Sequence, residues 1–368
     1  MNNSRILISF IVAFILTFVT TPFVKKLAFK IGAVDVPRDS RRMHKKPTAR
    51  LGGLAIFIGF IISALAYADM TRALGGILAG CAVIVVLGIF DDIYALSAKL
   101  KFGVQLIAAL MPVFCGVRID FIKVPEFISQ YGYIGLGWFS VPLTVLWIVG
   151  ITNAINLLDG LDGLACGVSA IASLTMLFVA MLVSDANSNV AIILACLCGA
   201  CLGFIPYNLN PAKIFMGDTG ALLLGYILST VSVIGMFKFY AVITFVLPVL
   251  ALAVPLSDTI FAFTRRILHG QSPFHADRGH FHHKLLDMGL SQKQAVAVLY
   301  AVSAILGLSA VLLTSTGIVR IVVAVIAFVI AVSIWFFVFR HNNNIHVHHN
   351  NAPAQEAEKK EEPENEQT

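Results

Sequence analysis

Six aspartates stand at the ends of long apolar runs, where a carboxylate can reach water while its neighbours stay in a nonpolar phase. They are Asp91, Asp92, Asp159, Asp162, Asp218 and Asp258. A charged side chain at the centre of a bilayer costs about 2.5–3.5 kcal/mol, so a helix end is the less costly position. Carboxylates gathered at one surface need a cation, and Mg²⁺ fits because it takes one or two protein oxygens and bridges to substrate phosphates. Any single Asp could instead cap a helix, but the set, beside glycine-rich segments, favours a metal–phosphate site.

A short polar stretch in the middle of the chain combines amides, carboxylates and glycines. Asn153, Asn156 and Asp159 recur every three residues, which places them on one face if the segment is helical. An amide that faces lipid is costly, so this face is expected to line a polar cavity. Gly160 and Gly163 let the backbone break there and approach a ligand.

Another candidate lies where Phe215-Met216-Gly217-Asp218 precedes an apolar run. Asp218 is placed either to bind a metal ion at the mouth of the following helix or to cap that helix, with Thr219 assisting. The sequence leaves both alternatives open at this position.

The longest polar stretch between apolar runs, residues 265–293, carries Arg266 and the cluster His280, His282 and His283. Arginine and histidine together supply the charge and the multiple donors that a polyphosphate requires. A His-x-His-His cluster could instead bind Zn²⁺, but no cysteine or HExxH helix supports a zinc site. A basic loop on the membrane surface with no site is the remaining alternative.

The composition defines the elements that must position these residues. Of the 368 residues, 58% are hydrophobic and only 12% are charged, which excludes an ordinary globular domain, a disordered chain and a disulfide-stapled secreted module. Runs long enough to span a bilayer lie near 6–24, 51–68, 73–90, 102–119, 139–157, 161–183, 189–206, 219–236, 239–257, 295–314 and 318–339. The sequence therefore predicts an all-α integral membrane protein, a polytopic bundle of about 11 transmembrane helices.

The distribution of basic residues predicts the orientation of that bundle. With eleven spans and the N-terminus outside, six of the 26 Lys and Arg lie on outer segments, which leaves 20 on the cytoplasmic side. All six aspartates then face the cytoplasm, and the net charge of +6 suits loops on an anionic leaflet rather than nucleic acid. Residues 1–340 form one membrane domain, and the polar segment 341–368 is expected to be a disordered cytoplasmic tail.

On its motifs the chain resembles the polyprenyl-phosphate N-acetylhexosamine-1-phosphate transferases, glycosyltransferase family 4. It is most similar to the bacterial undecaprenyl-phosphate GlcNAc-1-phosphate transferases, which include the enzymes that start wall teichoic acid and O-antigen synthesis. The resemblance covers about residues 1–320 and rests on Pro47–Gly53, Phe90–Asp92, Asn153–Gly163, Phe215–Gly220 and Asp277–His283.

The resemblance implies an enzyme of the bacterial inner membrane with its active site facing the cytoplasm. The implied reaction joins undecaprenyl phosphate and UDP-GlcNAc to give undecaprenyl-diphospho-GlcNAc and UMP, with Mg²⁺ as cofactor and Mn²⁺ as its substitute. Asp218 resembles the metal ligand, Asn156 a second ligand, and Asp91 and Asp92 the paired catalytic carboxylates. The remaining implied contacts to nucleotide, phosphate and sugar are Lys46, Lys101, Asn153, Asp159, Asp162, Phe215, Arg266, His280, His282 and His283. Related enzymes often dimerise, so a homodimer is also expected.

Three other functions compete with this interpretation. The phospho-MurNAc-pentapeptide transferases share the scaffold, and the His-Phe-His-His spacing favours the GlcNAc branch by analogy. A transporter would normally place its charges near the midplane in repeated halves, and no half-to-half similarity is seen. A CDP-alcohol phosphotransferase is disfavoured because Ala165 is followed by Cys166 instead of arginine.

Overall fold

The structure of the protein, a computed structural model, describes residues 2–37, 47–123, 133–183, 188–235, 249–268 and 280–333. Its helices are α1 (Asn2–Ile31), α2 (Gly52–Tyr67), α3 (Arg72–Tyr94), α4 (Ala98–Phe114), η1 (Gly137–Phe139), α5 (Ser140–Leu158), α6 (Leu164–Val183), α7 (Ser188–Asn208), α8 (Gly217–Gly235), α10 (Ala253–Leu268), α11 (Phe281–Asp287), α12 (Gln292–Thr314) and a last helix, Gly317–Ser333. Two antiparallel strand pairs join β1 (Val34–Asp35) to β2 (Thr48–Ala49) and β3 (Phe121–Lys123) to β4 (Tyr133–Gly135). The predicted all-α architecture is confirmed for these residues.

The helices have the length and composition of a multi-pass membrane protein. Among the described residues, α1, α3, η1 with α5, α6, α7, α8 and α12 make seven helices that are long and apolar enough to cross a membrane. Two shorter apolar helices, α2 and Gly317–Ser333, accompany them. The count of eleven spans and the orientation stay predictions. About half of the ninth predicted run falls on residues 236–248, which are outside the described ranges, and so does the predicted tail, residues 341–368.

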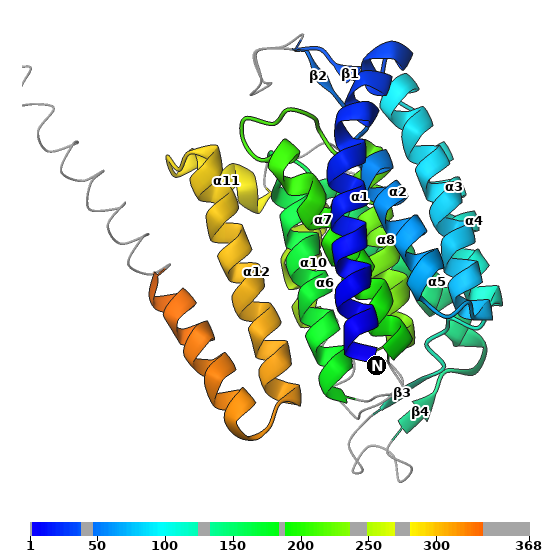
Figure 1. Ribbon diagram of the computed structural model, residues 1–368, viewed down its shortest axis with the longest axis vertical. Helices are drawn as coiled ribbons and strands as arrows, with labels where there is room; N and C mark the ends of the chain where they lie inside the picture. The colour runs from blue at the N-terminus through cyan, green and yellow to red at the C-terminus, as the bar shows by residue number, and fades with distance from the viewer. Residues whose placement is uncertain are drawn as a thin grey trace, which may run out of the picture.

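Helix α8 forms the centre of the bundle (Figure 1). All but two of its 19 residues are buried, and α2, α3, α5, α6 and α7 pack around it. It begins at Gly217-Asp218, at the end of the bundle that also carries β1 and β2. We call this the site end.

Glycines let two neighbouring helices reach the first turn of α8. A Cβ added to Gly53 of α2 would lie 2.0 Å from the backbone nitrogen of Gly220. A Cβ on Gly88 of α3 would lie 2.3 Å from Cα of Thr219. Both distances are far below van der Waals contact, so hydrogen is the one side chain these positions can hold without moving the backbone.

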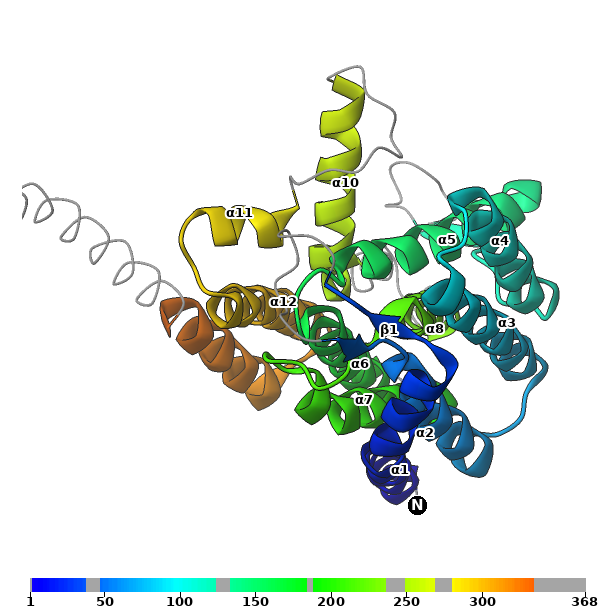
Figure 2. The same cartoon turned by 90° about the horizontal axis from the view of Figure 1, so that it is seen from above.

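Helix α10 projects away from the bundle, as Figure 2 shows. It buries a stripe that includes Asp258 and Arg266, whereas the exposed side chains include Phe261, Ile267 and Leu268. A helix with polar groups inward and apolar groups outward is suited to a nonpolar solvent and to a polar site within the protein.

Candidate active site

Backbone hydrogen bonds tie two distant motifs together at the site end. The amide of Phe215 donates to the carbonyl of Ala49 at 2.8 Å, and the amide of Gly52 donates to the carbonyl of Phe215 at 2.9 Å. Arg50 therefore stands beside the segment that leads into α8, although 168 residues separate it from Asp218.

Asp92 caps α8 from another helix. Its Oδ1 accepts from the backbone N–H of Asp218 at 2.8 Å, and its Oδ2 accepts from the N–H and the hydroxyl of Thr219 at 3.0 and 2.6 Å. The Asp92 side chain is 0% exposed. A carboxylate that satisfies the first N–H groups of a helix is held by those donors and by the helix dipole. The sequence left open that Asp218 caps this helix. In the structure Asp92 is the residue that caps it.

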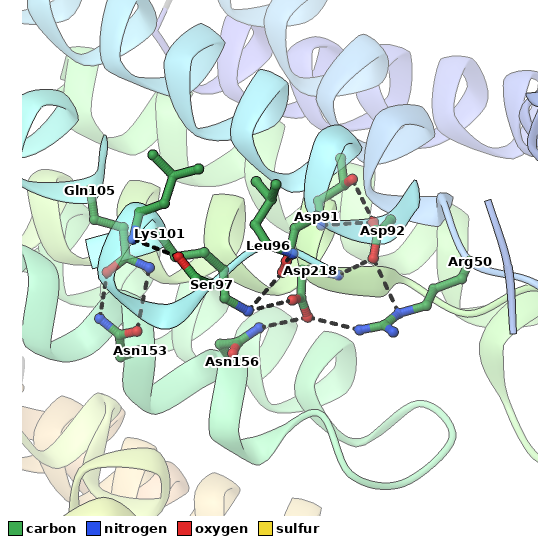
Figure 3. A network of polar contacts seen from close by, with 12 residues as sticks. Arg50, Asp91, Asp92, Leu96, Ser97, Lys101, Gln105, Asn153, Asn156 and Asp218 are labelled. Carbon is green, nitrogen blue, oxygen red and sulfur yellow. Dashed lines mark hydrogen bonds and ion pairs between the residues drawn. The ribbon is translucent and has the colours of Figure 1, made fainter. Parts of the chain in front are cut away.

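Asp218 is released by this arrangement to face the polar groups shown in Figure 3. Its Oδ1 accepts from Nη2 of Arg50 at 3.0 Å and from Nδ2 of Asn156 at 3.1 Å. Its Oδ2 accepts from Nζ of Lys101 at 3.2 Å. With the side chain 16% exposed, against 3% for Asp91 and 0% for Asp92, Asp218 is the carboxylate of the network best placed to meet a ligand.

Asp91 differs from Asp92 in its partners. Its Oδ1 accepts from the backbone N–H of Leu96 at 2.8 Å, and its Oδ2 accepts from Lys101 at 2.8 Å. Lys101 lies in the first turn of α4, which begins after the N-cap Ser97. The ammonium group therefore joins the carboxylates of Asp91 and Asp218 (Figure 3).

A cavity of about 900 Å³ opens beside this network. Its walls come from the loops before α2, between α5 and α6, between α7 and α8, and from α11 and α12. Among the lining residues are Arg50, Asn156, Asp159, Asp162, Phe215, Asp218 and His283. Six of these seven are predicted site residues, so the structure brings together most of the metal and nucleotide candidates.

Two carboxylates of the α5–α6 loop line the cavity in different ways. Burial raises the pKa of Asp159 to about 7, and the negative charge of Asp218 adds to the rise while Arg50 opposes it. Asp162 Oδ2 accepts from the side chain of Asn210 at 2.9 Å and from the backbone of Ala212 at 3.1 Å. Asp162 therefore fixes the loop that leads to Phe215.

Neither Asn153 nor Arg266 is among the cavity-lining residues, and nothing is described of Lys46. The amide of Asn153 is paired with that of Gln105 on α4, at 2.7 and 3.3 Å, and is not among the cavity-lining residues (Figure 3). Arg266 is buried on α10 and does not line the cavity. Lys46 lies outside the described residues. Their predicted substrate contacts stay predictions.

The histidine cluster, residues 280–283, forms the N-cap and first turn of α11, and Asp258 binds this turn. Nδ1 of His280 lies 2.8 Å from Oδ2 of Asp258, and the amide of Phe281 donates to Oδ1 of the same carboxylate at 2.7 Å. The rings of His280 and His282 are nearly parallel, with centroids 5.8 Å apart. Of the three histidines, His283 is the one that lines the cavity.

His282 is packed against the α5–α6 loop. A Cβ on Gly160 would lie 2.4 Å from its Nε2, so the ring occupies the space that this glycine leaves open. Burial lowers the pKa of His282 to about 4, and the neighbouring His283 contributes. The imidazole is therefore neutral near pH 7 and positions the loop as a packed ring.

Two functional residues were missed by the sequence reasoning. Arg50 stood inside the Pro47–Gly53 motif and is the single charged residue of that segment, which was the available signal. Asp258 was among the six aspartates, but its partner could not be inferred from the sequence. In both cases the partner lies on another element of the fold.

The donor set fits a hard divalent cation. Mg²⁺ commonly binds one or two protein oxygens and completes its shell with water and phosphate. Asp218 supplies a partly exposed carboxylate beside the amide of Asn156, both facing the cavity. Within the described ranges, no group of three or more His, Cys, Asp or Glu is arranged to hold a metal ion.

A bundle of apolar helices with a network of three carboxylates and two side-chain cations beside an open cavity at one end has the architecture of a multi-pass membrane protein with a charged site. Comparisons with known proteins identify it further. The model of glycosyl transferase family 4 matches residues 74–236. A probable undecaprenyl-phosphate N-acetylglucosaminyl 1-phosphate transferase of Bacillus subtilis is 46% identical over 315 residues, covering 85% of this chain and 86% of that protein. The chain belongs to glycosyl transferase family 4.

Two other relatives have lower sequence identity to this chain. A decaprenyl-phosphate N-acetylglucosaminephosphotransferase of Mycolicibacterium smegmatis is 37% identical over 78% of this chain and 77% of that protein. A phospho-N-acetylmuramoyl-pentapeptide-transferase of Staphylococcus epidermidis is 34% identical over 82% and 96%. The two GlcNAc-phosphate relatives are thus more similar to this chain than this pentapeptide transferase.

Proposed function

We propose that the protein transfers N-acetylglucosamine 1-phosphate from UDP-GlcNAc to undecaprenyl phosphate, forming undecaprenyl-diphospho-GlcNAc and releasing UMP. The observation that carries this proposal is the cavity in which the Asp218 carboxylate lies between Arg50 and Lys101. A carboxylate flanked by two cations suits a phosphorylated substrate that arrives with a divalent ion. The printed name of the 46% identical relative supports the donor and the acceptor.

The GlcNAc branch is preferred over the pentapeptide branch on the same grounds. Identity to the B. subtilis GlcNAc-phosphate transferase is 46%, against 34% and 32% for two pentapeptide transferases. A transporter is disfavoured because the described charged network gathers at one end of the bundle rather than at its middle.

Asp218, together with the amide of Asn156, is the proposed site for Mg²⁺, with Mn²⁺ as a substitute. The bound ion would supply positive charge to the diphosphate of the donor. Phosphoryl transfer depends mainly on positioning and on charge stabilisation, and the chain contributes Arg50 and Lys101 to both.

The proposed chemistry is a direct displacement. An oxygen of the lipid phosphate forms a bond to the β-phosphorus of UDP-GlcNAc, while the bond from that phosphorus to the bridging oxygen breaks and UMP leaves with that oxygen. A phosphate monoester has its second pKa near 6, so the acceptor is largely a dianion at neutral pH and needs no strong base. Asp91, held by Lys101, orients the acceptor and takes any remaining proton. Recovery of a phosphorylated enzyme after incubation with UDP-GlcNAc alone would contradict this direct step.

The loops around the cavity are proposed to select the nucleotide and the sugar. Phe215 offers a ring to the uracil, and Asp159 lies on the nucleotide side. His283 reaches the cavity directly, whereas His280 and His282 hold the turn that carries it. The site is proposed to face the cytoplasm from the bacterial inner membrane, and the product is proposed to start a surface polymer such as teichoic acid or O-antigen.

A radiolabelled sugar panel tests the function. Purified full-length protein in detergent with Mg²⁺ and undecaprenyl phosphate is expected to convert UDP-GlcNAc to a lipid-linked product and UMP. UDP-MurNAc-pentapeptide serves as the competing donor. Transfer from the pentapeptide donor alone, or the absence of UMP release with any donor, would reject the proposal. Light scattering of the same sample tests the predicted homodimer.

A further inference from the structure

We propose that Arg50 is an exchangeable counter-ion: it neutralises Asp218 while the metal is absent, and it turns toward the substrate phosphates when a divalent cation takes Asp218. The inference rests on the proposed function for the identity of the phosphates, but the exchange itself concerns Asp218 and a metal ion alone.

The first argument is that Asp218 depends on its cations. Each of its two oxygens accepts from a cationic side chain, Arg50 at 3.0 Å and Lys101 at 3.2 Å. Among the described residues, the three carboxylates of Asp91, Asp92 and Asp218 pair with these two cations, so the network carries one net negative charge. A divalent ion entering at Asp218 relieves that excess and competes with Arg50 for the same oxygen.

The second argument is that Asp92 does not need Arg50. Nε of Arg50 lies 3.1 Å from Oδ1 of Asp92, yet that carboxylate also accepts three hydrogen bonds from Asp218 and Thr219 at the start of α8. Because the helix terminus stabilises the buried charge, the carboxylate of Asp92 keeps its hydrogen-bond donors when the guanidinium of Arg50 moves away.

The third argument is that the backbone of Arg50 is fixed by hydrogen bonds, whereas its side chain has room to move in the cavity. Its amide donates to the carbonyl of Ala33 at 2.9 Å, and its neighbours are bonded to Phe215. Its side chain, in contrast, is 39% exposed and lines the cavity. A long side chain on a rigid base can exchange one anion for another, and its planar fork matches phosphate oxygens.

Lys101 is the less exchangeable of the two cations. It lies 2.8 Å from Asp91 and only 3.2 Å from Asp218, so it keeps a closer partner when a metal takes Asp218. Its side chain is also less exposed, at 27% against 39% for Arg50. The exchange is therefore assigned to Arg50.

The test measures binding of Mn²⁺ alone, without nucleotide, by electron paramagnetic resonance on full-length protein in detergent. Arg50→Gln is expected to bind Mn²⁺ roughly tenfold more tightly than the wild type, because a competing unit charge beside a metal ligand is removed. Arg50→Lys keeps the charge and is expected to stay within about threefold of the wild type. Arg72→Gln is the matched control, since Arg72 binds the carbonyl of Phe114 far from the site.

Equal or weaker Mn²⁺ binding in Arg50→Gln would overturn the exchange, and so would unchanged binding in Asp218→Asn. A second measurement needs no variant: Mn²⁺ is expected to increase the modification of Arg50 by phenylglyoxal, read by mass spectrometry. Unchanged or reduced modification overturns the proposal. The outcomes also separate the two claims, because tighter Mn²⁺ binding in a protein without transferase activity rejects the proposed function and keeps the exchange.

Discussion

The two ends of the bundle use the same residue types for different purposes. At the site end, Arg50 and Lys101 are shared by three carboxylates, and the Asp92 side chain is 0% exposed. At the opposite end, Arg5 and Asp69 form one pair at 3.4 Å with side chains 44% and 68% exposed. An exposed pair contributes about 0–1 kcal/mol, whereas the loss of one partner from a buried network leaves an uncompensated charge.

This contrast shows that burial and connectivity, rather than the number of charges, distinguish a site from a surface. The pair at the far end can be removed with little effect, because water replaces each partner. The network at the site end joins Arg50, which follows β2, to side chains of α3, α4, α5 and α8, so each of its members constrains several elements at once. The following changes separate the members of that network by what each one does.

The largest effect is expected for Asp218→Asn. The change keeps the shape of the side chain but removes the charge that pairs with the two cations and that is proposed to bind the metal ion, so metal-dependent turnover is expected to fall by at least about a thousandfold. Thermal unfolding in detergent should change little. Asp69→Asn at the opposite end is the matched control, and near-normal turnover in Asp218→Asn would remove this residue from the site.

A second change, Asp92→Ala, tests the cap. It leaves the first N–H groups of α8 without an acceptor in a buried place, which is expected to cost about 2–3 kcal/mol of stability. The measurement is the midpoint of thermal unfolding, with Asp218→Asn beside it. If Asp92→Ala unfolds at the same temperature as Asp218→Asn, the cross-helix cap is wrong.

His282→Ala is expected to have an intermediate effect, a loss of roughly tenfold to a hundredfold in turnover through a displaced α5–α6 loop. Because the pKa of His282 is lowered to about 4, its ring is neutral from pH 6 to 8 and the loss should be the same across that range. His348→Ala in the predicted tail is the control. Equal losses in both variants, or a loss that grows with acidity, would contradict the packing role.

The smallest effect concerns the pH dependence of stability. The pKa of Asp159 is raised from the ordinary range near 4 to about 7, so the folded protein holds this proton more tightly than the unfolded chain does. Stability from this group is therefore full below pH 4 and is lost as the pH rises through 7. Asp159→Asn removes that loss, so its unfolding midpoint is expected to exceed the wild type by about 2–4 °C at pH 8. The difference is expected to shrink as the pH falls and to vanish below pH 4. If the unfolding midpoints of both proteins fall in parallel as the pH rises, the pKa of Asp159 is not raised in the folded protein.

The sequence predicted the helices and the location of the acidic groups well, because both depend on local patterns. Long apolar runs identify membrane-type helices, and the cost of charge in a nonpolar phase places aspartates at their ends. The structure places Asp159, Asp162 and Asp218 in the lining of one cavity, while their predicted roles stay predictions.

The sequence could not distinguish roles that depend on distant partners. Asp91 and Asp92 are adjacent in the chain, yet one is bound to Lys101 and the other to the start of α8, 126 residues away. Asn153 follows the same three-residue spacing as Asn156, but Gln105 on the facing helix takes its amide. Only the packing of α3, α4 and α8 decides which side chain turns to the cavity.

The glycine contacts at Gly53 and Gly88 divide the molecule into parts with different freedom to evolve. Both glycines contact the backbone of the first turn of α8 directly. A substitution at either position would therefore push the backbone apart and change the distance between Asp92 and Asp218. The loops that line the cavity, in contrast, are held by side-chain contacts, such as the ring of His282 against Gly160. Donor preference can therefore diversify by exchanging those loops, while the reaction centre is inherited as a fixed unit.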